Sequence, residues 1–154
     1  MPLTWSGPTV ADWQVRKIAL LGPGIVGMPM AALLAQARPC IGTTAPAEVL
    51  VVQRDSPTSG WKVDAINRGR SVIGGVEPGL DDVVRQAVAE GLLRATHDPD
   101  EAADADVVVV CIQTDRDGDG RDYGPLFAGL DGLAQALRRR PAGNVPLVVI
   151  DSTL

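Results

Sequence analysis

Two hydrophobic patterns alternate along the chain. Short runs of consecutive apolar residues, which are typical of strands buried on both faces of a sheet, end at glycine or at polar residues. Between them lie segments in which apolar residues recur every three or four positions, as on one face of a helix. The runs predict strands at residues 18–21, 49–55, 92–96, 107–112 and 145–150. The helical spacing predicts helices at residues 26–37, 61–68, 77–91, 98–103 and 125–140.

The order of these elements predicts the fold class. Strands that alternate with helices are typical of α/β folds, in which each helix connects two parallel strands. Because Val107–Ile112 is apolar throughout, we expect it at the centre of the sheet, covered on both faces. The sequence therefore predicts a Rossmann-like three-layer sandwich with a mainly parallel sheet. Its strands, numbered along the chain, are expected in the order 3-2-1-4-5.

The first predicted strand ends at a glycine loop, Gly22-Pro23-Gly24-Ile25-Val26-Gly27, that opens the first predicted helix. In such a loop the first glycine permits a tight turn, the second lets a pyrophosphate approach, and the third allows close packing of helix on strand. The alternative is a glycine turn without a ligand. The position between a buried strand and an amphipathic helix favours a dinucleotide site, with Gly22, Gly24, Ile25, Val26 and Gly27 at the phosphates.

Asp55 ends the second predicted strand, where an acid commonly binds the hydroxyls of the adenosine ribose. It lies 33 residues after Gly22, more than the roughly 20 that are usual, and the long connection at residues 38–48 can absorb the excess. A carboxylate there repels a 2′-phosphate, which favours NAD over NADP. The adjacent Arg54 weakens that preference, and a solvated acid without a ligand is the alternative interpretation.

Composition and charge narrow the class of protein. The 154 residues, 45% of them hydrophobic, suffice for one domain, which we assign to residues 17–154 behind an N-terminal arm at residues 1–16. A formal net charge of −5 argues against nucleic acid, whose phosphates attract basic surfaces. No apolar run approaches the roughly 20 residues of a membrane span, and the two cysteines form no CxxC pair. We therefore expect a cytoplasmic protein without a membrane partner.

Other candidate chemistry receives less support. Residues 115–124 are expected to form a loop, whose start imitates an EF-hand calcium loop, but Leu126 stands where the ligand glutamate is needed. No metal site is therefore expected. His97, the only histidine, directly precedes Asp98-Pro99, which favours a capping or loop role over catalysis. Cys111 falls in a hydrophobic strand and is interpreted as a buried apolar side chain.

Several segments together resemble the NAD-binding domain of the UDP-glucose/GDP-mannose dehydrogenase family, the nucleotide-sugar dehydrogenases, and in particular its UDP-N-acetylmannosamine dehydrogenase-like members. The resemblance covers residues 17–154 and rests on an ordered set of motifs: Gly22–Ala31, Val63–Gly69, Glu77–Leu80, Val109–Thr114 and Asp151–Thr153. It implies NAD as cofactor. It also implies that the full-length enzyme, an oxidoreductase of polysaccharide biosynthesis, oxidises the C6 alcohol of a UDP-sugar to a carboxylate with two NAD.

The resemblance also assigns residue roles. By position, Thr114 matches a threonine that lies beside the nicotinamide and orders a catalytic water, Asp151 falls where relatives usually carry glutamate, and Thr153 matches a threonine near the cofactor. Gln113 and Asp115 depart from the prolines that usually flank the threonine, which leaves the substrate open. The family's nucleophilic cysteine and its substrate domain match no residue here. We therefore expect a fragment of a longer enzyme, able to bind cofactor but inactive alone.

Two alternatives to this function remain open. One is the cofactor domain of a 3-hydroxyacid-type dehydrogenase, whose glycine loop is similar, although Glu77-Pro78-Gly79-Leu80 argues against it. The other is a nucleotide-sensing Rossmann module without catalysis. A homodimer also stays open, and the sequence does not identify the sugar.

Overall fold

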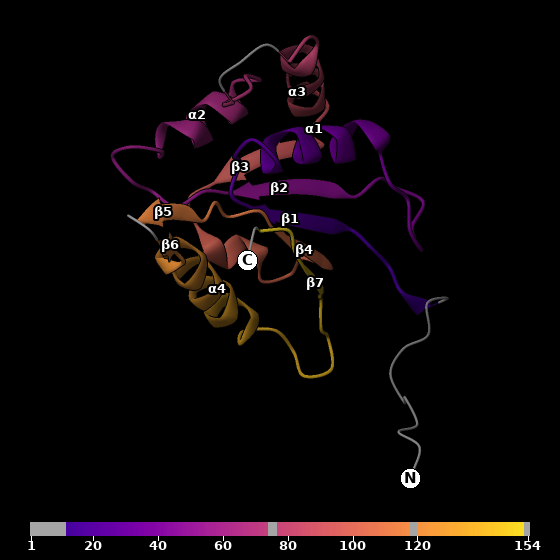
Figure 1. Cartoon of the computed structure of the whole chain (residues 1–154). Helices are drawn as coiled ribbons and strands as arrows, with labels where there is room; N and C mark the ends of the chain where they lie inside the picture. Colours follow the sequence, from indigo (N-terminus) through magenta and orange to yellow (C-terminus); the bar gives the residue numbers. More distant parts are fainter. Residues whose placement is uncertain (1–11, 74–76, 118–119, 153–154) are drawn as a thin grey trace.

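The computed structural model of the chain describes residues 12–73, 77–117 and 120–152 (Figure 1). Its strands are β1 (Lys17–Leu21), β2 (Glu48–Val52), β3 (Leu93–Thr96), β4 (Val107–Val110), β5 (Asp115–Asp117), β6 (Gly120–Asp122) and β7 (Leu147–Ile150). Its helices are α1 (Gly27–Ala37), α2 (Trp61–Asn67), α3 (Leu80–Ala89), α4 (Gly124–Leu137) and the short 3-10 helix η2 (Pro99–Ala102).

Five of the strands form a parallel sheet in the order β3-β2-β1-β4-β7. In numbers along the chain this is the predicted order 3-2-1-4-5, because β5 and β6 stand apart from the sheet. β4 lies between β1 and β7, which confirms that it is an interior strand, although β1 is the middle strand of the five. The register aligns Leu21 with both Val52 and Val110, so the strands β1, β2 and β4 end together at one edge.

The core consists of two apolar layers, one on each face of the sheet. Helices α1, α2 and α3 cover one face, where Met28, Ile66 and Val84 are fully buried. Helix α4 and η2 cover the other, where Leu126 and Ala102 are buried. Figure 1 shows this arrangement, with α1, α2 and α3 on one side of the strands and α4 on the other. The chain is thus the predicted Rossmann-like three-layer α/β sandwich.

The main departure from the predicted elements lies at residues 115–124. The sequence predicted a loop, whereas β5 and β6 pair as an antiparallel hairpin in which Asp117 faces Gly120. The segment Asp117-Gly118-Asp119-Gly120 contains aspartate–glycine pairs, which favour two-residue turns between strands. Residues 118 and 119 lie outside the described residues. The predicted loop was therefore wrong for β5 and β6, because residues 115–117 and 120–122 pair as strands.

Element ends also differ from prediction by a few residues. β2 ends at Val52, three residues before Asp55, and α3 begins at Leu80, after Pro78. The predicted short helix at 98–103 is the 3-10 helix η2, whose first turn is capped by the Asp98 carboxylate, 2.9 Å from the amide of Asp100. These shifts reflect the weakness of local signals at element boundaries, where hydrogen-bond partners rather than periodicity decide the last residue.

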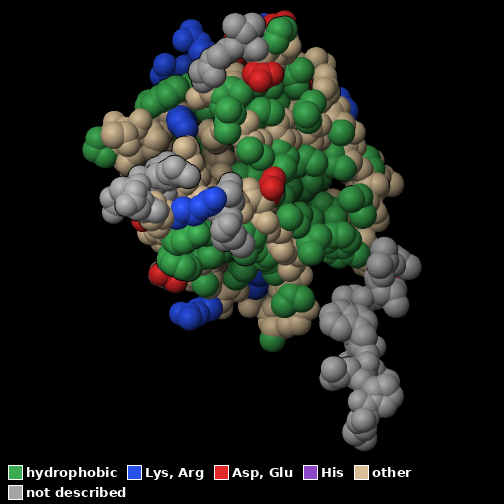
Figure 2. Space-filling view, in the orientation of Figure 1, with side chains coloured by type: hydrophobic (Ala, Val, Ile, Leu, Met, Phe, Trp, Pro, Cys, Tyr) green, Lys and Arg blue, Asp and Glu red, His purple; other side chains and the backbone are tan. Residues whose placement is uncertain are grey.

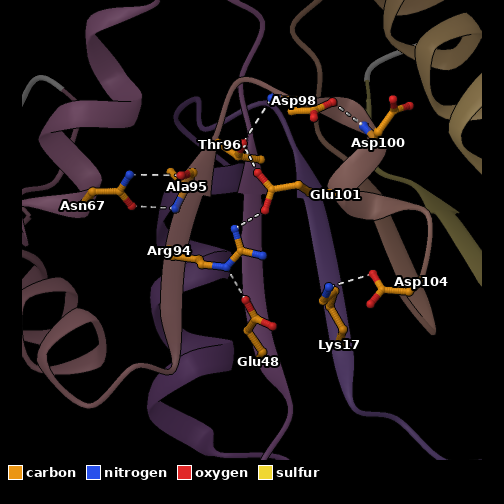
Figure 3. A network of polar contacts seen from close by, with 10 residues as sticks. All are labelled: Lys17, Glu48, Asn67, Arg94, Ala95, Thr96, Asp98, Asp100, Glu101 and Asp104. Atoms are coloured by element: carbon orange, nitrogen blue, oxygen red, sulfur yellow. Dashed lines mark hydrogen bonds and ion pairs between the residues drawn. The ribbon is translucent and has the colours of Figure 1, made fainter.

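A polar network connects β2, β3 and η2 at one end of the sheet (Figure 3). Arg94 of β3 donates to Glu48 of β2 and to Glu101 of η2, each at 2.5 Å. The hydroxyl of Thr96 also donates to Glu101. The hydrogen bond from Thr96 and then the one from Arg94 lower the pKa of Glu101 below its ordinary value. The network therefore fixes the segment that leads from β3 into η2.

Strand β7 forms one edge of the sheet and leaves its apolar side chains partly uncovered. Its four residues are between 40% and 49% exposed, and Figure 2 shows hydrophobic side chains gathered on the face that is seen there. At the start of the described chain, Val15 is buried and forms an isolated antiparallel bridge with Ile41. None of the helices in the described ranges has the length and apolar character needed to cross a bilayer.

Candidate functional site

The glycine loop connects β1 to α1 in a conformation that requires two of its glycines. Gly22 has φ +93°, and a Cβ there would lie 2.8 Å from the carbonyl oxygen of Cys111. A Cβ on Gly27 would collide with the carbonyl oxygen of Gly22 and approach the side chain of Leu20. Because both collisions involve backbone or buried core, Gly22 and Gly27 are required by the fold itself.

Gly24 differs from its two neighbouring glycines. A Cβ added there would meet no atom within 4 Å, so the backbone at Gly24 faces open space. The amides of Ile25, Val26 and Gly27 follow at the start of α1, and within the described ranges none of them donates to a backbone carbonyl. Amides without partners at a helix N-terminus, together with the positive end of the helix dipole, attract an anionic group. The open space at Gly24 thus fits a pyrophosphate.

A cleft of about 500 Å³ opens beside this loop at the carboxyl ends of the strands. It is lined by residues that follow the strands and by one face of α4. After the strands come Gly22, Pro23 and Gly24 (β1), Gln53, Arg54 and Asp55 (β2), His97 and Pro99 (β3), and Ile112 and Gln113 (β4). Helix α4 contributes Ala128, Gly129 and Gly132. A more open hollow of about 800 Å³, lined by Arg16 and residues 42–46 among others, involves none of the glycine-loop residues. The cleft is therefore the candidate site.

Asp55 lies three residues beyond the end of β2, is exposed and lines the cleft together with Arg54. A Cβ on Gly60 would lie 2.7 Å from the Asp55 carboxylate, so the absence of a side chain there makes room for the acid. Lys62 of α2 donates to the carbonyl oxygen of Pro23 at 3.3 Å. The structure thus brings the glycine loop, the predicted acid and a lysine to one cleft.

Lys62 and His97 were not among the predicted site residues. No local signal marks Lys62, because α2 reaches the glycine loop only through tertiary packing. His97 was interpreted as a capping or loop residue; it lies in the bend between β3 and η2, where Asp98 provides the cap and His97 lines the cleft. Its Nδ1 lies 2.9 Å from the carbonyl oxygen of Gln53. In the sequence, the only signal for a place of His97 in the cleft was that the single histidine directly follows a predicted strand.

Two of the residues assigned by resemblance, Thr114 and Asp151, lie at the edge of the sheet where the glycine loop begins. Thr114 is half-buried and follows β4, and Asp151 is exposed and directly follows β7, with its amide donating to the carbonyl of Val110 at 2.8 Å. Thr114 is not among the residues that line the cleft, whereas its neighbour Gln113 is. Thr153 lies outside the described residues. Thr114 and Asp151 therefore follow two neighbouring strands of the sheet, β4 and β7.

Cys111 is buried and is one of the residues that line the cleft. Desolvation, and to a smaller extent the nearby negative charge of Asp151, raise the pKa of its thiol to about 11. The thiol is therefore protonated near neutral pH and is a poor nucleophile, in line with the interpretation of Cys111 as a buried apolar side chain. Cys40 is exposed and lies outside the cleft. In the described part of the chain, no group of three or more His, Cys, Asp or Glu side chains could hold a metal ion.

The topology and the cleft together define a class of protein. A five-stranded parallel sheet in the order 3-2-1-4-5, with a glycine loop that opens α1 at the point where strand order reverses, is the dinucleotide-binding Rossmann arrangement. The sequence narrows this class to a family, because residues 16–154 match the UDP-glucose/GDP-mannose dehydrogenase family, NAD binding domain. The chain belongs to this family, and its cofactor is NAD.

Individual relatives agree with this assignment. The chain is 35% identical over 143 residues to an NDP-N-acetyl-D-galactosaminuronic acid dehydrogenase of Ralstonia nicotianae, and 32% identical over 144 residues to a UDP-N-acetyl-D-mannosamine dehydrogenase of Campylobacter jejuni. These alignments cover 92% and 91% of the chain but only 29% and 30% of the relatives. The crystal structure of an NDP-N-acetyl-D-galactosaminuronic acid dehydrogenase from Methanosarcina mazei Go1 superposes with a TM-score of 0.79 at 34% identity, over 92% of this chain and 28% of that one.

Proposed function

We propose that the chain is the cofactor-binding part of an NAD-dependent nucleotide-sugar 6-dehydrogenase. The whole enzyme oxidises the C6 alcohol of a UDP-sugar to a carboxylate, with two NAD consumed per sugar. The observation that carries the proposal is the cleft, where the open backbone at Gly24 and the carboxylate of Asp55 lie in one cavity. The relatives, whose names describe dehydrogenases of nucleotide sugars, support the substrate class.

Each cofactor-binding residue has a physical task in this proposal. The amides of Ile25, Val26 and Gly27 donate to the pyrophosphate, which lies against Gly24. Gly22 and Gly27 keep the loop and α1 in place for that contact. Asp55 accepts hydrogen bonds from the ribose hydroxyls and disfavours a 2′-phosphate. Lys62, tied to the carbonyl of Pro23, adds a positive charge beside the phosphates.

The proposed chemistry takes place at the carboxyl ends of β4 and β7. NAD supplies the hydride acceptor there. Thr114, after β4, and Thr153 are proposed to contact the nicotinamide half of the cofactor. Asp151, after β7, is proposed to act with Thr114 on the water that attacks the carbon being oxidised. We propose that the substrate-binding residues and the nucleophile lie outside this chain, whose alignments cover only 29% and 30% of the two relatives.

Isothermal titration calorimetry with NAD, NADP and ADP tests the cofactor site. We expect NAD and ADP to bind and NADP to bind more weakly. Asp55→Asn removes a charge-assisted hydrogen bond and should weaken NAD binding about tenfold to a hundredfold, while narrowing its preference over NADP. Asp64→Asn is the matched control, because Asp64 is an exposed acid of α2 that does not line the cleft. Equal losses in the two variants would contradict the role of Asp55.

Substrate oxidation is tested with the whole enzyme of which we propose this chain to be the cofactor-binding part. We expect NADH to form when a UDP-sugar is added, with two NADH per sugar acid produced, and no turnover from the 154-residue chain alone. UDP-glucose, UDP-N-acetylmannosamine and GDP-mannose serve as the competing substrates. NAD binding without oxidation of any of these by the longer protein would favour a nucleotide-sensing module, and oxidation of a 3-hydroxyacid would favour the other alternative.

A further inference from the structure

His97 lies at a defined place in the cleft, although the proposed function gives it no role. It is the first residue after β3, and it lines the cleft together with Pro99. The hydrogen bonding between β2 and β3 extends one residue beyond the end of β2 here, because the amide of Gln53 donates to the carbonyl of Thr96 at 3.0 Å. The imidazole Nδ1 then lies 2.9 Å from the carbonyl oxygen of Gln53. Two contacts therefore fix His97 against the end of β2.

The contact with Gln53 determines which nitrogen of the ring carries the proton. A carbonyl oxygen can only accept a hydrogen bond, so Nδ1 must donate to it. In the neutral imidazole Nε2 is then the acceptor. Within the described ranges no residue donates to Nε2. His97, which lines the cleft, thus carries its lone pair on Nε2, because a backbone carbonyl holds the proton on Nδ1.

The shape of the cleft indicates what this lone pair would meet. A dinucleotide with its pyrophosphate at Gly24 and its ribose at Asp55 carries its base next to the ribose, on the side of β2 and β3. The walls there are His97, Pro99 and Gly132, all of which line the cleft. A Cβ on Gly132 would lie 3.9 Å from Pro99, so α4 and the start of η2 approach each other closely. A flat ring, a proline and a glycine suit the faces of an aromatic base, although polar residues such as Gln53 and Ser59 also line the cleft.

We infer that His97 selects the adenine base of the dinucleotide, by accepting a hydrogen bond at Nε2 from the 6-amino group. This inference rests on the proposed cofactor site and adds a residue that reads the base. A 6-oxo base such as hypoxanthine presents a carbonyl oxygen instead. The neutral ring could donate from Nε2 only by giving up the proton on Nδ1, which would leave two acceptors facing each other at Gln53, so the comparison of bases applies to the neutral imidazole. Either tautomer therefore loses one hydrogen bond with the 6-oxo base.

Calorimetry with two pairs of ligands tests this selectivity. The pairs are NAD with nicotinamide hypoxanthine dinucleotide, and ADP with inosine diphosphate, which differ in the same base. At one fixed pH we expect the adenine member of each pair to bind about tenfold more tightly, the value of one neutral hydrogen bond. His97→Phe keeps an aromatic ring without the acceptor and should bring each ratio close to one. Asp64→Asn, an exposed position of α2 outside the cleft, is the control and should leave the ratios unchanged.

Nitrogen NMR gives an independent readout, because the chain has a single histidine. In the free chain the ¹⁵N signals should report the tautomer with the proton on Nδ1. Addition of ADP should shift the Nε2 signal toward that of a hydrogen-bonded acceptor, and inosine diphosphate should not. A proton on Nε2 in the free chain, or ratios equal in the unmodified chain and in His97→Phe, would overturn the inference and leave the cofactor site standing. Failure of all four ligands to bind would overturn the cofactor site as well.

Discussion

Asn67, the last residue of α2, connects that helix to the edge of the sheet through its side chain. Its Nδ2 donates to the carbonyl oxygen of Ala95 at 2.9 Å, and its Oδ1 accepts from the amide of Ala95 at 2.7 Å (Figure 3). Ala95 is buried in β3, the outer strand on that side of the sheet. The amide group of Asn67 therefore takes the place of a neighbouring strand at this residue and satisfies both backbone groups.

The Asn67→Ala variant removes both hydrogen bonds at once. Each is worth about 1 kcal/mol net, and a buried amide left without a partner costs about 1 to 3 kcal/mol. We therefore expect the free energy of unfolding to fall by about 2 to 3 kcal/mol. At roughly 2 to 4 °C per kcal/mol for a chain of this size, the melting temperature should fall by about 5 to 10 °C. Urea denaturation followed by circular dichroism measures the first quantity and a thermal scan the second.

Asn67→Asp separates the two contacts. The introduced carboxylate can still accept from the amide of Ala95, but its second oxygen faces the carbonyl oxygen, so only one bond is kept at neutral pH. Protonation restores a donor, and the folded state therefore raises the pKa of the new carboxyl group. The loss of stability relative to the unmodified chain, at equal pH, should accordingly shrink between about pH 7 and about pH 4.

Asn144→Ala is the matched control for these variants. Asn144 lies in an exposed turn, and its side-chain oxygen accepts a hydrogen bond from Arg140 at 2.6 Å. Arg140 keeps the carbonyl oxygens of Ala103 and Ala105 as partners, so we expect a loss below about 1 kcal/mol. If Asn67→Ala cost no more than this control, the argument that Asn67 replaces a strand neighbour would be refuted.

Three further expectations follow from named contacts. Gly27→Ala should lower the free energy of unfolding by about 1 to 3 kcal/mol, because its Cβ meets backbone, and a melting temperature equal to that of the unmodified chain would contradict this. Gly24→Ala should keep that melting temperature but bind ADP more weakly in calorimetry. The lowered pKa of Glu101 stabilises the fold above its unfolded pKa of about 4.3, so Glu101→Gln should cost more at neutral pH than in acid, as measured by urea titrations at both. Since the pKa of Cys111 is about 11 and Cys40 is exposed, iodoacetamide should modify only Cys40 in the native chain, and a second adduct by mass spectrometry would argue against a buried thiol.

Local patterns predicted the parts of the fold that depend on burial. Val107–Val110 is apolar because both faces of β4 are covered, and the same physical cause makes a central strand recognisable in a sequence. The glycine loop was equally recognisable, since the collisions around Gly22 and Gly27 restrict those positions to one residue type. Where burial or a close backbone contact restricts a position to one type of residue, the sequence was enough to predict the local structure.

Contacts between distant segments were not predictable in the same way. Asn67 is bonded to a backbone 28 residues away, and Lys62 to a carbonyl 39 residues away. Both are polar residues on a short helix, where exposure to solvent is the ordinary expectation. His97 was noticed as the only histidine, but its tautomer depends on the carbonyl of Gln53, 44 residues earlier. Such roles become visible only once the sheet has brought the carboxyl ends of its strands together.

The unusual spacing between the glycine loop and Asp55 shows why geometry at the sheet matters more than distance along the chain. The register places Leu21 beside Val52, so the residues after β1 and after β2 begin at the same edge regardless of the sequence between them. Part of that sequence, residues 38–47, connects α1 to the start of β2 and is tied there by the amide of Ala47, which donates to the carbonyl of Pro39 at 2.9 Å, and by the bridge from Val15 to Ile41. This connection lies at the amino ends of the strands, away from the cleft. Extra residues there leave the position of Asp55 unchanged, and the separation of 33 residues is compatible with the same site that a shorter connection would form.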